Sequence, residues 1–194
     1  MNQTLEALLN RVSIPANQLT DPAPAGAELE QIIQAAVCAP DHGGIRPWRF
    51  LLISGDQRHQ LGRIFCNAAL AKTPDLDEKE LQSIRAKPLR SPLIVTVIAT
   101  AKPHPKVPPD EQLFSAAAAT QNILLAADAL GYGAIWLTGP YAADPQVWQQ
   151  LGLGKDERII AFVYLGTPSP DATAAKKKIQ NRPRAADFIV EWKP

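Results

Sequence analysis

The sequence has little excess charge and no long hydrophobic run. Its 20 Lys and Arg residues nearly balance 19 Asp and Glu residues, so the 194-residue chain has a formal net charge of +1. A chain so balanced has no overall field that would attract nucleic acid or acidic membranes. No apolar run approaches the roughly 18 residues that a membrane-spanning helix needs. We therefore expect neither nucleic acid nor a membrane as a partner.

Cysteine and histidine are also scarce. The two thiols, Cys38 and Cys66, form no CxxC pair, and the histidines at 42, 59 and 104 have no metal-ligand spacing. We expect no metal site, and two isolated thiols suit a reducing compartment. The first residues lack the basic-then-apolar order and the small-residue cleavage site of a signal peptide. These features predict a cytoplasmic protein.

Two common catalytic motifs are missing. The stretch "GYGAIWLTG" does not fit GxGxxG, and no acidic residue lies at the required distance beyond a βαβ unit, so a Rossmann dinucleotide site is not expected. No GxSxG occurs, and a hydrolase that pairs His42 with a serine lacks the strand–turn–helix context that its nucleophile needs. The "AAKKK" run at 174–178 is typical of a solvated surface.

The patterns that are present predict one α+β domain with a helix-covered sheet, without repeats or a linker. The run 91–101 is rich in β-branched residues without polar alternation, which favours a central strand. The segment 113–131 is Ala-rich and apolar nearly all round, so it should be buried on most sides. Strands are expected at 49–54, 91–101, 133–139 and 157–168, and helices at 3–10, 28–37, 55–73, 75–90, 113–131 and 144–154.

Two short segments could contact a ligand. In "NRVS", Arg11 and Ser13 offer a guanidinium and a hydroxyl, which together suit a phosphate. From this short fragment alone, an ordinary exposed Arg beside a capping Ser is the preferred interpretation. In "APDHGGIRPWRF", residues 39–50, Gly43 and Gly44 leave the backbone open to a planar ligand. His42 could contact that ligand or cap the preceding helix. Trp48 is more typical of a core.

The order of these pieces resembles that of the nitroreductase family of FMN-dependent oxidoreductases. The sequence places "R-x-S" after a short helix, then "APDHGGIRPW", an Ala-rich helix ending in "LGYGAIW", a "YLGTP" strand, and a basic tail. "APDH" before "PW" is similar to the small, YdjA-like branch. The resemblance implies a nitroreductase-like α+β fold: a mixed, mainly antiparallel sheet flanked by helices, in an intertwined homodimer. Two FMN sites would lie at the subunit interface, with the C-terminal segment extended over the partner.

The resemblance also implies a set of cofactor-binding positions. Arg11 and Ser13 match the phosphate-binding pair, with Val12 contributing backbone, and Arg182 adds to that grip. His42 matches the loop that reaches the flavin from the other subunit. Cys38 stands where the close branch often has Arg. The full set is Arg11, Val12, Ser13, Cys38, His42, Trp136, Leu137, Thr138 and Arg182. Because the usual cation after the Ser is missing, FMN should be held more weakly unless Arg182 or Arg184 compensates.

The function implied by the resemblance is oxidation of NAD(P)H and reduction of nitroaromatics, quinones or similar two-electron acceptors. FMN performs the redox step in one shared pocket, by a ping-pong mechanism, and no side chain is assigned as a catalytic acid or base, although His42 could donate a proton. Two alternatives stay open. One is a flavin carrier or sensor of the same fold without turnover, and the other is a non-catalytic dimerisation protein.

Overall fold

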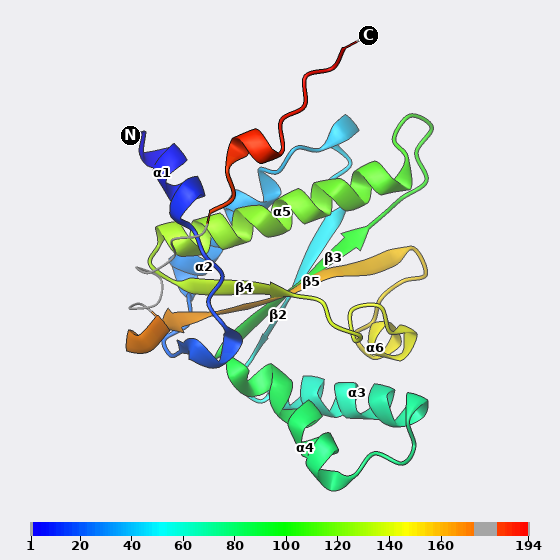
Figure 1. Ribbon diagram of the computed structural model, residues 1–194. Coiled ribbons are helices and arrows are strands. Elements are labelled where there is room, and N and C mark those ends of the chain that lie inside the picture. The colour runs from blue at the N-terminus through cyan, green and yellow to red at the C-terminus, as the bar shows by residue number, and fades with distance from the viewer. Residues whose placement is uncertain (1, 173–181, 194) are drawn as a thin grey trace.

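A five-stranded antiparallel sheet lies at the centre of the computed structural model, which describes residues 2–172 and 182–193 (Figure 1). The central strand β5 pairs with β3 on one side and with β4 and β1 on the other, while β2 pairs with the far edge of β3. All of these pairings are antiparallel, in agreement with the mainly antiparallel sheet predicted. The strands are β1 (Leu19–Thr20), β2 (Trp48–Ser54), β3 (Leu93–Thr100), β4 (Gly133–Leu137) and β5 (Glu157–Pro168).

Helices cover both faces of the sheet, as the sequence predicts. The α-helices are α1 (Gln3–Asn10), α2 (Gly26–Val37), α3 (Gln57–Lys72), α4 (Glu78–Ala86), α5 (Pro109–Ala129) and α6 (Pro145–Gln150). Short 3₁₀ turns are η1 (Ala16–Gln18), η2 (His42–Gly44), η3 (Lys87–Arg90) and η4 (Ala185–Asp187). Helices α2 and α5 lie on one face, and α3, α4 and α6 lie toward the other (Figure 1).

The strand β3 shows how the two faces are built. Its side chains alternate, so Val95 and Val97 belong to the core under α2 and α5, whereas Ile94 and Ile98 belong to the core under α3 and α6. All four are fully buried. A strand buried on both faces has no polar alternation, which is why the run 91–101 is apolar throughout.

Within one chain, the long helix α5 is buried on one side only. Ala116, Ala119 and Ile123 are fully buried, but Phe114 on the outward side is 69% exposed. The burial on most sides that the Ala-rich sequence predicts is therefore incomplete in a single chain.

The segment after α1 is held against β4. The backbone N–H of Ile14 donates to the carbonyl of Ala134 at 3.1 Å. Gly133 allows this approach, because a Cβ there would lie 2.6 Å from Leu19 Cδ2 and 3.1 Å from Ile14 Cγ1. The close packing fixes where the preceding residues, Arg11 to Ser13, leave the end of α1.

The described end of the chain begins at Arg182, which contacts Arg11, and extends away from the body of the molecule after η4 (Figure 1). Its apolar side chains are unusually open, with Val190 89% and Trp192 85% exposed. In the described part of the chain, no helix combines the length and the apolar character required to cross a bilayer.

Candidate functional site

Three side chains chosen from the sequence meet at the end of α1. Arg11 Nη1 lies 3.5 Å from Ser13 Oγ, and Arg182 Nη2 donates to the backbone carbonyl of Arg11 at 2.6 Å. We call Arg11, Ser13 and Arg182 the Arg11 cluster. Residues 171 positions apart in the chain therefore present two guanidinium groups and a hydroxyl at one place.

The charges of the Arg11 cluster favour an anion. Partial burial is the main cause that lowers the pKa of Arg11, the nearby charge of Arg182 lowers it further, and Asp128 acts in the opposite direction. A guanidinium whose protonated form is disfavoured by desolvation and by a second cation gains stability when an anion binds beside it. Two guanidinium groups and a hydroxyl are also the donors that suit a phosphate.

The end of β4 carries the next three predicted positions, and they do not share one environment. The Trp136 indole Nε1–H donates to the Ile160 carbonyl at 3.1 Å, and its ring packs with the core under α2 and α5. Leu137 packs on the opposite face, with the core under α3, and so does Val12. Thr138 is exposed just beyond the strand. Leu137 and Thr138, but not the Trp136 ring, therefore face the α3 side of the sheet.

A cavity of about 300 Å³, which we call the β4 cavity, opens beside Leu137 and Thr138. It is walled by aromatic rings, including Phe65 and Tyr141, which stack with centroids 4.2 Å apart. None of the described residues that line the cavity is acidic. Its apolar walls and its position past a strand end suit a flat aromatic ligand.

Two cations in the β4 cavity were not singled out from the sequence. Lys87 Nζ lies 5.0 Å from the centroid of the Tyr141 ring, and the Arg90 guanidinium lies 5.5 Å from that of Tyr164. Both residues belong to η3, inside the charged segment 75–90 that the sequence predicts to be an exposed helix. The one sequence signal for their role is that they stand directly before the apolar strand β3.

His42 lies far from the Arg11 cluster in the same chain. Its Nδ1 pairs with Glu111 Oε2 at 2.7 Å, near the start of α5, whereas Asp128, which influences Arg11, lies in the last turn of that helix. Seventeen residues of α-helix span about 25 Å. One chain alone therefore does not bring His42 to the Arg11 cluster.

Cys38 also lies apart from the β4 cavity. It borders an apolar groove of about 540 Å³ between α1, α2 and α5, together with Leu8 and Leu125. The Cys38 thiol accepts a hydrogen bond from Gln34 Nε2 at 3.8 Å. Across residues 2–172 and 182–193, no group of three or more His, Cys, Asp or Glu side chains is placed to hold a metal ion.

Known proteins resemble this chain over most of its length. A family model described as "Nitroreductase family" matches residues 9–167. The Escherichia coli K12 protein named "Putative NAD(P)H nitroreductase YdjA" is 38% identical over 171 residues, which are 88% of this chain and 91% of that protein. A nitroreductase-like family protein from Bacillus cereus, 22% identical, superposes with a TM-score of 0.78 and covers 100% of this chain and 98% of that one. A Desulfovibrio desulfuricans protein described as a "putative nitroreductase in complex with fmn" is 25% identical with a TM-score of 0.69, over 100% of this chain and 99% of that one.

Proposed function

The chain belongs to the nitroreductase family, and from this premise we propose that it is an FMN-dependent oxidoreductase that uses NAD(P)H to reduce small two-electron acceptors. The observation that carries the proposal is the Arg11 cluster, which precedes Ile14, the residue that pairs with Ala134 of β4; the β4 cavity opens past the end of the same strand. An anion grip and an aromatic-lined cavity on neighbouring segments match the two ends of FMN.

The residues present fit the phosphate end of FMN. Arg11 and Ser13 would hold the phosphate. Arg182 binds the Arg11 carbonyl and would also add a second positive charge. Arg182 thereby compensates for the cation missing after Ser13. Charge-assisted contacts of this kind contribute about 1.5–3 kcal/mol each when they are buried.

The β4 cavity fits one edge of the flavin ring. Leu137 and Thr138 would lie along the ring, and Lys87 would face it as the nearest ammonium group. A positive charge near the ring nitrogens favours the reduced, more electron-rich flavin, because it stabilises the charge that reduction adds. Lys87 therefore tunes the redox potential rather than transferring a proton.

The remaining positions call for a second copy of the chain. His42 and the Arg11 cluster lie at opposite ends of α5, so only the His42 of a partner subunit could approach the same flavin. Phe114 on the open side of α5 and the exposed apolar groups of residues 188–192 offer the surface that such a partner would cover. We propose an intertwined homodimer with two equivalent sites, in which His42 and Cys38 lie near the interface.

No side chain is required as an acid or base. Bound FMN would supply the two-electron redox chemistry, with NAD(P)H as donor and a nitroaromatic, a quinone or a similar compound as acceptor in ping-pong turnover. His42 is paired with Glu111 in the free chain, so its role is contact and orientation. The protein's own task is to hold the anionic end and to wall the ring with aromatic groups.

An absorbance spectrum tests the proposal. The purified protein should be yellow, or should become so with added FMN, and NADH or NADPH should bleach the flavin bands under anaerobic conditions. Added nitroaromatic or quinone should then restore the bands and sustain NAD(P)H oxidation. A protein that takes up no FMN contradicts the proposal, and one that holds FMN without turnover is instead a flavin carrier or sensor.

A further inference from the structure

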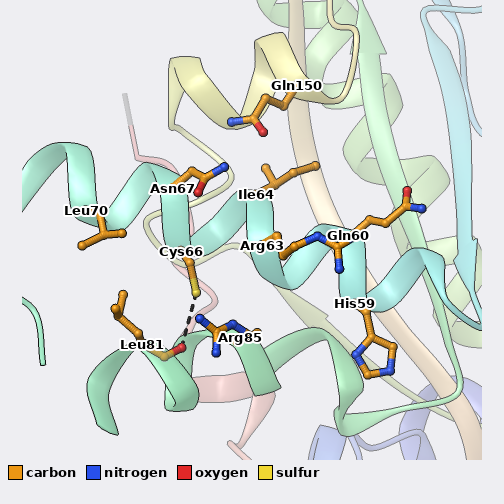
Figure 2. A pocket seen from close by; sticks show the side chains of 10 residues that line it. All are labelled: His59, Gln60, Arg63, Ile64, Cys66, Asn67, Leu70, Leu81, Arg85 and Gln150. Atoms are coloured by element: carbon orange, nitrogen blue, oxygen red, sulfur yellow. Dashed lines mark hydrogen bonds between the residues drawn. The ribbon is translucent and has the colours of Figure 1, made fainter. Parts of the chain in front are cut away.

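A third hollow, a cleft of about 630 Å³, lies on the outer side of α3, between α4 and α6. Figure 2 shows the side chains that reach it from these three helices. The α3 residues that line it are centred on the side of the helix opposite Phe65, which faces the β4 cavity. The helix α3 thus separates the two cavities, and we call this one the α3 cleft.

Two guanidinium groups line the α3 cleft, that of Arg63 from α3 and that of Arg85 from α4, beside the imidazole of His59 (Figure 2). Among the described residues that line the cleft, none is Asp or Glu. The whole of α3, residues 57–72, contains three Lys and Arg residues and no acidic residue. An exposed helix usually mixes charges of both signs, so the one-sided charge of α3 is unusual.

The two arginines are hardly neutralised by the protein. Arg63 has no ion pair or side-chain hydrogen bond with any described residue. Arg85 pairs with Glu78 at 3.3 Å, but the two side chains are 45% and 77% exposed, and such surface pairs contribute little.

Close helix packing brings the backbones of α3 and α4 together. Gly62 faces α4, and a Cβ at this position would collide with the backbone carbonyl oxygen of Arg85. Arg63 and Arg85 therefore enter the α3 cleft from adjoining stretches of two helices, and an anion in the cleft would be attracted by both charges.

The rest of the α3 cleft is partly apolar. Ile64, Leu70 and Leu81 form apolar wall, and the Cys66 thiol is already satisfied by the Leu81 carbonyl at 3.3 Å, the dashed line in Figure 2. Asn67 and Gln150 offer amide groups. The volume lies within the range of small-molecule sites. A bare inorganic ion would leave most of this surface uncovered.

We propose that the α3 cleft binds a small organic anion, a phosphate or carboxylate carried on an apolar frame, with Arg63 and Arg85 holding the charged group. This site is separate from the Arg11 cluster and from the β4 cavity. The proposal does not depend on the redox function, since it rests only on the residues of α3, α4 and α6.

Phenyl phosphate is a suitable probe, because it joins a phosphate to an apolar ring. It should be titrated into ¹⁵N-labelled full-length protein saturated with FMN, and the backbone amide shifts of α3 and α4 followed by NMR. We expect saturable shifts at residues 59–70 and 81–85. The double substitution Arg63→Gln with Arg85→Gln should weaken binding by at least about tenfold, whereas the exposed control Lys79→Gln, on the same helix α4, should not.

Several outcomes would overturn the proposal. These are the absence of saturable shifts, equal affinity in the control and the double variant, or shifts confined to residues 11–13. If inorganic phosphate binds as tightly as phenyl phosphate, the proposed contribution of an apolar frame to binding is wrong. If the double variant unfolds, the single Arg63→Gln change provides the same test, because Arg63 makes no contact that the fold needs. FMN retention is measured separately, so a failure here leaves the redox proposal intact.

Discussion

Replacing Arg11 with Gln should weaken FMN binding and leave riboflavin binding almost unchanged. The Arg11 guanidinium is half-buried, and its charge is opposed by desolvation and by Arg182, with Asp128 acting in the opposite direction. The ligand phosphate would add a favourable interaction that riboflavin lacks. The substitution keeps a polar side chain of similar reach, so the end of α1 should still pack against β4.

The magnitude follows from the exposure of Arg11. A fully buried charge-assisted hydrogen bond contributes about 1.5–3 kcal/mol. Because Arg11 keeps some contact with water, we expect its contact with the phosphate to contribute about 1–2 kcal/mol. Losing that contact corresponds to a roughly five- to thirtyfold rise in the Kd for FMN. The loss should be larger for Arg11→Gln combined with Arg182→Gln, since Arg182 contributes a charge and also holds the Arg11 carbonyl.

Quenching of flavin fluorescence measures both affinities in one assay. Lys155→Gln, which removes an exposed charge from the turn before β5, is the matched control, and a thermal melt shows whether each variant is folded. Equal FMN affinity in the Arg11 variant and the control would refute the phosphate assignment. An equal loss of FMN and riboflavin affinity would show that Arg11 supports the fold of the site instead.

Three further predictions concern the surroundings of the site. Lys87→Met should lower the midpoint potential of bound FMN by tens of millivolts, since each 1.4 kcal/mol of lost stabilisation of the reduced flavin corresponds to about 30 mV. An unchanged potential in spectroelectrochemistry would show that Lys87 does not lie near the flavin. Asp144→Asn should lower the free energy of unfolding by about 1–3 kcal/mol in urea, because the amide still caps α6 but loses the ion pair that Asp144 makes with Lys72 at 2.5 Å. Burial acts to raise the pKa of Asp144, but Lys72 and the helix N–H groups together lower it below its ordinary 3.8. The stabilisation is therefore present above that pH and is lost as the pH falls further. A difference in unfolding free energy between wild type and variant that persists in strong acid would contradict this prediction. Gly62→Ala should cost about 1–3 kcal/mol, because α4 must move away from α3, and an unchanged melting temperature would show that the two helices are not in contact there.

The sequence predicts the elements of this fold well, where local patterns decide them. The helix predicted at 3–10 is α1, and the strand predicted at 157–168 is β5, both with the same bounds. Asp144 and Pro145 mark the start of α6 as capping preferences require. The two-residue strand β1 was not predicted, because its pairing with Pro168 and Thr167 depends on a distant part of the chain.

Contacts between distant segments limit what the sequence reveals of the site. No local pattern shows that Arg182 reaches the Arg11 carbonyl, and the prediction of a shared phosphate grip came from the family resemblance. The sequence does not single out Lys87 within the charged segment 75–90, because only the packing of η3 against α3 and α4 turns it toward the cavity. The assignment of His42 stays a prediction, since it requires a second subunit.

Native mass spectrometry of the purified, FMN-saturated protein tests the central claim most directly, because the claim is that two chains together enclose two flavins. The account predicts a species with the mass of two chains and two FMN molecules, which loses FMN more readily in the Arg11→Gln variant. A single chain that retains one FMN, or a protein that retains none under conditions where the fold is intact, would contradict it.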